Sequence, residues 1–165
     1  ASLNVGQSGT CHAASTSRSV MSFSLANSVS SCRWPSRFAA SIHSLCQSVR
    51  DFWVMTAEND PSRIVGCCAL QISWLDTAEI RTLAVAKDHQ GRGIGKALVQ
   101  SCIREAAGLG IRSLFTLTYV PGFFTGMGFC EVEKSSLPNK IWSDCIHCQY
   151  FPDCREVALT YGIDG

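Results

Sequence analysis

Residues 78–98 read AEIRTLAVAKDHQGRGIGKAL, and this stretch decides how the chain folds. Its first part, Glu79 to Val85, is mostly apolar and predicts a buried strand. The glycines of the segment Gln90–Lys96 interrupt the strand, and a helical period begins at Gly95. A loop that leads into a helix directs unpaired backbone N–H groups and the positive end of the helix dipole toward one point. The stretch therefore predicts a binding site for phosphate.

The glycine spacing distinguishes between three kinds of phosphate loop. A P-loop has four residues between its first glycine and Gly-Lys, whereas Gly91 and Gly95 enclose three. The dinucleotide fingerprint requires a glycine where this chain has Lys96. The remaining pattern, Gln-x-x-Gly-x-Gly, is met by Gln90, Gly93 and Gly95, and it resembles the pyrophosphate loop of the GNAT superfamily of N-acetyltransferases. The alternative is a helix-initiating turn whose glycines bind nothing.

This resemblance implies that acetyl-coenzyme A (acetyl-CoA) lies along the strand and the loop. It also implies a GNAT fold, an α/β architecture with a mixed central sheet and helices on both faces. The cofactor contacts would come from the end of the strand and from the loop. These residues are Leu83, Ala84, Val85, Gln90, Gly91, Arg92, Gly93, Ile94, Gly95 and Lys96.

Five downstream segments narrow the resemblance to one subfamily. They read LTYVPGFF (117–124), GMGF (126–129), LPNKIW (137–142), DCIHC (144–148) and FPDC (151–154). Together they resemble the short stand-alone amino-acid N-acetyltransferases related to N-acetylglutamate synthase. The resemblance implies that the chain acetylates an amino acid, with L-glutamate as the expected acceptor, and that it acts in arginine biosynthesis.

The periodicity of the remaining chain predicts an α/β layer fold. On the long helix, Leu98, Cys102, Ala106 and Leu109 share one stripe, and Gly110 is placed to cap its end. A turn is expected at Asp60-Pro61. The expected strands are 52–57, 64–74, 79–86, 113–120, 129–133 and 156–161, and the expected helices are 37–49, 95–109 and 122–127.

Composition limits the classes of function. A chain of 165 residues suits one domain with a full core. The formal net charge of +1 gives no electrostatic reason to bind nucleic acid, and no apolar run reaches the length of a membrane span. The expected partner is a small-molecule substrate, and a homodimer is left open.

The N-terminal third differs in composition from the rest. Residues 1–50 contain no Asp, Glu or Lys but have four arginines and abundant serine, which is typical of an organellar transit peptide. We therefore expect a leader or a divergent N-terminal segment over residues 1–30, and the acetyltransferase domain over 31–165. The apolar surroundings of Cys67, Cys68 and Cys102 predict buried, reduced thiols and a cytoplasmic protein, with an organellar matrix as the alternative.

Acetyl transfer from a thioester to an amine needs a base, a stabilised oxyanion and a proton for the leaving thiolate. Glu79 is the candidate base. Alternation along the strand puts Glu79, Arg81 and Leu83 on one face. Arg81, about 7 Å further along, could hold an acceptor carboxylate with its planar guanidinium. The alternative is that Glu79 and Arg81 form an ordinary surface ion pair.

Three further groups complete the predicted chemistry. Tyr119, at the end of its strand, is the candidate acid, and the alternative is a tyrosine packed in the core. A backbone N–H near Val85 is expected to stabilise the oxyanion. Lys140 is the candidate partner of an acceptor side-chain carboxylate, and the alternative is a solvated lysine.

A cysteine cluster follows these residues. Cys145, Cys148 and Cys154 have spacing suited to a structural zinc ion, with His147 or Cys130 as a fourth ligand. The alternative is a set of reduced or disulfide-linked structural cysteines. Three other functions also stay open: acetylation of a different amine such as a peptide terminus or a polyamine, coenzyme A binding without catalysis, and metal sensing.

Overall fold

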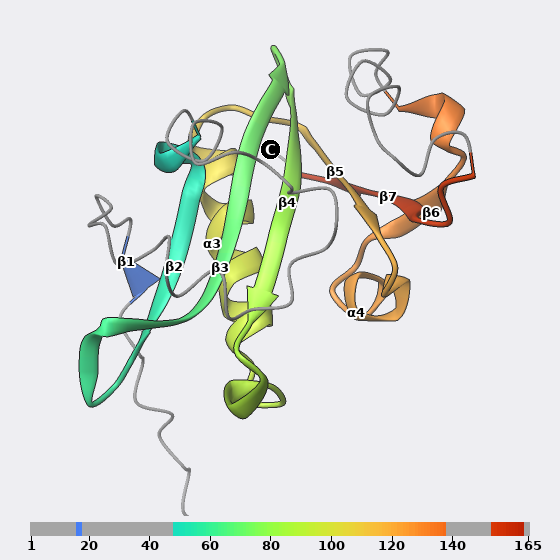
Figure 1. The fold of residues 1–165 in the computed structure, drawn as a ribbon. Coiled ribbons are helices and arrows are strands. Elements are labelled where there is room, and N and C mark those ends of the chain that lie inside the picture. The colour runs from blue at the N-terminus through green and yellow to red at the C-terminus, as the bar shows by residue number, and fades with distance from the viewer. Residues whose placement is uncertain (1–15, 18–47, 138–152, 164–165) are drawn as a thin grey trace, which may run out of the picture.

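The computed structural model describes residues 16–17, 48–137 and 153–163. They form a seven-stranded sheet in the order β1-β2-β3-β4-β5-β7-β6 (Figure 1). β4 and β5 are parallel, and the other neighbouring pairs are antiparallel. The predicted mixed α/β sheet is confirmed. The strands are β1 (Thr16–Ser17), β2 (Phe52–Ala57), β3 (Asp60–Trp74), β4 (Thr77–Val85), β5 (Ser113–Thr118), β6 (Cys130–Val132) and β7 (Val157–Gly162).

The six predicted strands are present, but the first hairpin turns earlier than expected. Asp60 and Pro61 were predicted as a turn and instead begin β3, because Ala57 pairs with Asp60 and residues 58–59 make the reversal. An oxygen of the Asp60 carboxylate accepts hydrogen bonds from the Ser62 backbone N–H at 3.0 Å and from the Ser62 hydroxyl at 2.6 Å. These local bonds stabilise the start of the strand.

The long helix α3 (Ile94–Gly108) lies behind β3 and β4 in Figure 1. Leu98, Cys102 and Ala106 are fully buried on its inner face, as the stripe predicted. Leu109 was expected on the same stripe, and this was wrong. The helix ends at Gly108, so the Leu109 side chain is 54% exposed.

Gly110 ends α3 as predicted. Its φ of 76° is a left-handed conformation that glycine adopts without steric cost. The Gly110 N–H donates to the Ala107 carbonyl at 3.1 Å, and the Ile111 N–H donates to the Ala106 carbonyl at 3.0 Å. This pair of bonds is a Schellman cap.

The two faces of the sheet bury separate clusters. α3 and α4 (Pro121–Thr125) share one face, because Phe124 belongs to the same apolar cluster as Leu98. The other face carries two clusters, one around Phe52 and one around Phe115. The predicted helix 37–49 lies outside the described residues except for its last two, and Val49 begins the short 3-10 helix η2 (Val49–Asp51).

The thiols of the core are buried, as their apolar context predicted. Cys67, Cys68 and Cys102 are free and buried. The Sγ atoms of Cys68 and Cys102 lie 3.6 Å apart between β3 and α3. Their hydrogen bond, together with burial, raises the pKa of the Cys68 thiol well above its usual range.

Among the described residues, no helix has the length and apolar character that a membrane span requires.

A bulge interrupts β4 where it leaves β5. The register of β3 against β4 shifts between Cys67 and Ala69, so that Thr82 and Leu83 together oppose Cys68. Thr82 has a φ of 62°. β5 pairs with only the first three residues of β4 in the described part of the chain. The two strands therefore part next to the bulge.

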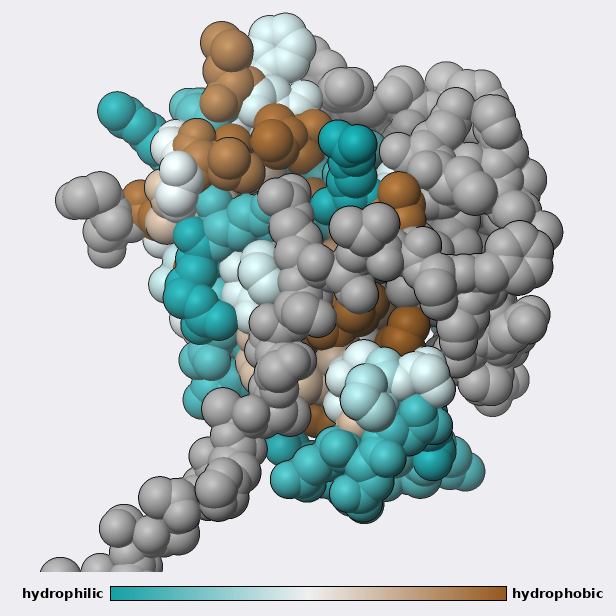
Figure 2. All heavy atoms as spheres, turned by 90° about the vertical axis from the view of Figure 1, so that its left-hand side faces the viewer, coloured by the Kyte–Doolittle hydropathy of each residue, from teal (hydrophilic) through white to brown (hydrophobic). Residues whose placement is uncertain are grey.

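Polar and apolar surfaces separate along β4. At the top of Figure 2, hydrophobic side chains are exposed over the tip of the β3–β4 hairpin, where Ile72 and Leu75 are 54% and 89% exposed. Hydrophilic side chains gather at the bottom of the same view. The β2–β3 hairpin and the 3-10 helix η3 (Lys87–His89) lie at this end of the molecule in Figure 1. The glycine loop thus begins at the charged end of β4.

Candidate functional site

The loop between β4 and α3 leaves the first turn of the helix open. Gly91 and Gly93 have φ of 75° and 80°. Gly93 is the N-cap of α3, and its carbonyl accepts the first helical hydrogen bond, from the Ala97 N–H at 3.0 Å. No side chain caps this end, so the N–H groups of the first turn and the helix dipole point outward together. The predicted succession of strand, glycine loop and helix is confirmed.

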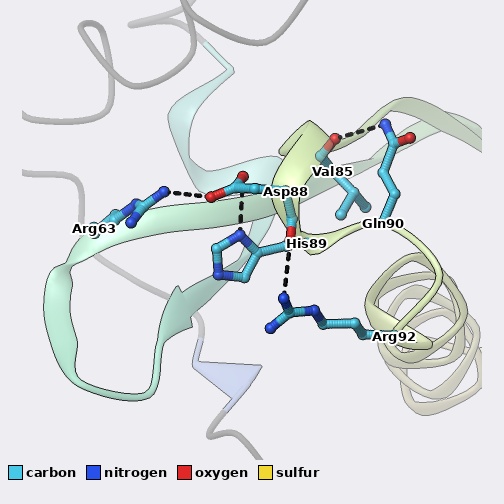
Figure 3. Close-up of polar contacts among 6 residues, drawn as sticks. All are labelled: Arg63, Val85, Asp88, His89, Gln90 and Arg92. Atoms are coloured by element: carbon cyan, nitrogen blue, oxygen red, sulfur yellow. Dashed lines mark hydrogen bonds and ion pairs between the residues drawn. The ribbon is translucent and has the colours of Figure 1, made fainter.

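Two side chains of the loop hold it against β4 (Figure 3). The side-chain amide of Gln90 donates to the Val85 carbonyl at 3.1 Å, which closes the loop onto the end of the strand. The guanidinium of Arg92 donates to the Asp88 carbonyl at 3.0 Å. The structure shows that Gln90 and Arg92 fix the shape of the loop, and their contact with the cofactor stays a prediction.

The Asp88 carboxylate joins the loop to the β2–β3 hairpin. It contacts the Arg63 guanidinium at 2.7 Å and the Nδ1 atom of His89 at 3.0 Å (Figure 3). The hydrogen bond with His89 and the charge of Arg63 hold the pKa of Asp88 below its usual range. The carboxylate thus stays ionised near neutral pH and offsets the positive charge that gathers beside the loop.

A cavity of about 260 Å³ opens where β4 and β5 part. Arg81, Thr82 and Leu83 line it from β4. Tyr119 lines it from the end of β5, and Glu156 lines it from just before β7. Small-molecule sites commonly combine apolar walls with a few polar groups in this way. Because the cavity and the glycine loop share β4, we take it as the candidate site for the reacting end of the ligand.

Glu79 and Arg81 lie on one face of β4, as predicted. Their charged groups are 3.8 Å apart, and the side chains are only 9% and 22% exposed. The Arg81 guanidinium also donates to the Gln71 side-chain carbonyl on β3. The ion pair of the alternative interpretation is therefore present, but it is largely buried rather than on the surface. Arg81 lines the cavity, whereas Glu79 lies one step back, opposite Phe115 in the paired part of β5.

Leu83 was predicted to share this face, and that was wrong. Cross-strand pairing places Glu79 beside Phe115, a residue of the cluster on the face opposite α3. Leu83 instead packs against the cluster that contains Leu98 of α3. The bulge at Thr82 adds one residue to the strand and so reverses the alternation beyond it.

The backbone of Val85 faces the gap between β4 and β5. The next residue, Ala86, donates its N–H to the Val65 carbonyl on the β3 side at 2.8 Å. Successive residues of a strand direct their backbone groups to opposite edges, so those of Val85 point away from β3. Its carbonyl accepts the Gln90 amide there. A backbone donor near Val85 thus has the orientation that the predicted oxyanion site needs.

Tyr119 is at the mouth of the cavity rather than in the core. Its side chain is 52% exposed, so the alternative of a packed core tyrosine is wrong. The lining residues that sequence reasoning missed include Thr82 and Glu156, which are 8% and 5% exposed. Glu156 had one weak signal, an acidic residue at the start of an apolar strand. Thr82 had none, because nothing in the sequence marks the bulge.

The remaining candidates lie mostly beyond the described residues. Lys140, Cys145 and Cys148 are outside them. Cys154 is half-buried, its backbone carbonyl accepts a hydrogen bond from the Lys134 ammonium at 2.6 Å, and its thiol lies 3.6 Å from Glu156. Within the described ranges, no three metal-ligating side chains come together.

Comparison with known proteins identifies the family. The profile of the Acetyltransferase (GNAT) family matches residues 23–129. The chain belongs to this family. It is an acetyltransferase, and the seven-stranded sheet with its helices is a GNAT fold.

Two relatives indicate the branch of the family. An uncharacterized N-acetyltransferase of Chlorobaculum tepidum is 36% identical over 120 residues, which cover 73% of this chain and 76% of the relative. The amino-acid acetyltransferase of Mycobacterium tuberculosis is 35% identical over 100 residues, which cover 61% of this chain and 58% of the relative. The predicted resemblance to amino-acid acetyltransferases is confirmed.

Two solved structures have similar folds. Rv2747 from Mycobacterium tuberculosis, in complex with CoA and NLQ, has a TM-score of 0.66 at 28% identity, covering 77% of this chain and 84% of that one. N-acetylglutamate synthase from Neisseria gonorrhoeae, complexed with coenzyme A and N-acetyl-glutamate, has a TM-score of 0.75. It covers 92% of this chain and 35% of that one, and at 22% identity it shows the fold alone.

Proposed function

We propose that this acetyltransferase transfers the acetyl group of acetyl-CoA to the α-amino group of an amino acid, with L-glutamate as the acceptor. The observation that carries the proposal is that β4 bears the cavity, with Arg81 in its wall, and ends in the glycine loop. A curated relative named amino-acid acetyltransferase and a solved relative in complex with CoA support it. Acetylation of glutamate would place the protein in arginine biosynthesis.

In this proposal the glycine loop binds the pyrophosphate of acetyl-CoA. The backbone N–H groups of residues 91–96 supply the hydrogen bonds, and Arg92 and Lys96 supply positive charge. The rest of the cofactor lies along the edge of β4 at Leu83 to Val85, which β5 leaves unpaired. The thioester carbonyl then lies in the cavity, with a backbone N–H of β4 directed at it.

The acceptor binds between the walls of the cavity. The Arg81 guanidinium pairs with its α-carboxylate, because a planar fork matches a carboxylate in geometry and charge. Glu79 receives the proton of the α-ammonium group, directly or through water, and Tyr119 returns a proton to the departing thiolate. Lys140 is proposed to pair with the side-chain carboxylate of glutamate.

Glu156 is the rival base. It lines the cavity itself, whereas Glu79 is not a lining residue and contacts Arg81, which is. The variants Glu79→Gln and Glu156→Gln separate the two, because each keeps the shape of the side chain and removes its ability to accept a proton. The variant that removes the true base should have a kcat lowered about 10²- to 10⁴-fold. The other variant should change mainly the KM of the acceptor.

The test of the function is a screen for acetyl-CoA-dependent thiol release with each amino acid, two polyamines and a peptide amine. We expect glutamate to give the highest kcat/KM. A different amino acid would correct the acceptor and keep the reaction class. A preference for the peptide or a polyamine would overturn the proposal, and coenzyme A binding without thiol release from any amine would exclude catalysis.

A further inference from the structure

Thr82 combines two unfavourable features in one residue. Among the described residues it is the only non-glycine with a positive φ, 62°. A β-branched side chain in this left-handed region is strained. Strain of this kind persists where the surrounding structure imposes it, often at a functional site.

The Thr82 hydroxyl is also unsatisfied. The residue is 8% exposed, and its Oγ1 atom has no hydrogen-bond partner in the described part of the chain. Burying a hydroxyl without a partner costs free energy. Thr118 provides a comparison, because it is also 8% exposed and lines the same cavity, yet its hydroxyl accepts the Val120 N–H at 3.1 Å.

A glycine at position 82 would avoid both costs. Glycine adopts a positive φ freely and is the usual first residue of one type of bulge. Neither the fold nor the bulge therefore requires a threonine here. What threonine adds is one buried hydroxyl, on a residue that lines the cavity and lies in the bulge.

We propose that the Thr82 hydroxyl donates a hydrogen bond to the carbonyl oxygen of the acetyl thioester and so forms part of the oxyanion site with the backbone N–H groups of β4. The proposal rests on the proposed acetyl transfer. As the nitrogen–carbon bond forms and before the carbon–sulfur bond breaks, negative charge develops on this oxygen. A donor already fixed in place stabilises that charge without having to reorganise. The hydroxyl keeps its proton throughout, and the amine proton passes to the base.

The test compares Thr82→Val, Thr82→Ser and Thr118→Val. Thr82→Val keeps the β-branched shape and the backbone strain and removes only the hydroxyl. We expect it to lower kcat about 10- to 100-fold, since a backbone donor remains, and to raise the KM of acetyl-CoA by a smaller factor, because the hydroxyl also contacts the ground-state carbonyl. Thr82→Ser restores the hydroxyl and should recover most of that loss.

Thermal stability distinguishes this role from a structural one. Removing an unsatisfied hydroxyl should leave the Tm of unliganded Thr82→Val at or above that of the wild type. Thr118→Val should lower the Tm, because it leaves the Val120 N–H without its acceptor. A Tm of Thr82→Val as low as that of Thr118→Val would assign the hydroxyl to the fold and overturn the inference.

A binding measurement needs no acceptor. Calorimetry gives the affinities of acetyl-CoA and of coenzyme A, which lacks the carbonyl. We expect the preference for acetyl-CoA to fall toward one in Thr82→Val, with the affinity for coenzyme A unchanged. If both the preference and kcat match the wild type, this inference is wrong while the proposed function stands. If the wild type transfers acetyl to no amine, the proposed function fails, and this inference fails with it.

Discussion

Substituting Gly93 by alanine tests the phosphate site at its geometric centre. With φ of 80° and ψ of 0°, Gly93 caps α3 in a conformation that alanine adopts at a cost of about 1–2 kcal/mol. No atom lies within 4 Å of the position that a Cβ would take, so the folding cost comes from the backbone alone. For a chain of this size the Tm should fall by about 2–8 °C.

The effect on the cofactor should be separate and larger. A methyl group at Gly93 projects from the loop, and any relaxation of its φ turns the N–H groups of the first helical turn away from the phosphate. We expect calorimetry to show acetyl-CoA binding weakened about tenfold or more, which corresponds to about 1.4 kcal/mol.

Gly110→Ala is the matched control. Gly110 has a φ of 76°, and a Cβ added there would likewise meet no atom within 4 Å, but this glycine caps the opposite end of the same helix. Its folding cost should be similar and its effect on acetyl-CoA affinity negligible. Equal acetyl-CoA affinities for folded Gly93→Ala and Gly110→Ala would refute the assignment of the loop as the phosphate site.

Three further predictions concern the strand, the core and the thiols. Glu79→Gln should lower kcat by about 10²- to 10⁴-fold in a steady-state thiol-release assay with little change in cofactor affinity, and near-normal turnover would remove Glu79 from the mechanism. Leu98→Ala, at a fully buried position on α3, should lower the free energy of unfolding by about 2–5 kcal/mol in denaturant titrations, and a loss below about 1 kcal/mol would contradict the packing of this helix. Exposed Cys130 should react with a maleimide in the native protein, whereas Cys68, buried and with a raised pKa, should react only on unfolding. Mass spectrometry of labelled peptides measures the order of reaction, and labelling of Cys68 before Cys130 would contradict the burial of Cys68.

The elements of the fold were predictable because their signals are local. Each signal spans only a short segment of sequence, and each predicted its element to within a few residues. The signals are the apolar run after Glu79, the glycines from Gly91 to Gly95 and the helical stripe that includes Leu98. The prediction of a phosphate site also needs these elements alone, because a helix start exposes its N–H groups whatever packs around it. Leu109 shows the limit of this reasoning, because the apolar stripe does not reveal that the helix ends one residue before Leu109.

The site for the reacting groups depends on contacts that are distant in sequence. The cavity exists because β5 leaves β4 after three paired residues, and Glu156 reaches it because β7 returns to pair with β5. The bulge at Thr82 reversed the predicted face of Leu83, because one extra residue shifts the period-two alternation beyond it. Sequence by itself therefore determined the strands, the long helix and the glycine loop between them, whose energetics are local. Tertiary structure alone decided which side chains meet in the cavity, because strand divergence and register are set by the packing of the whole sheet.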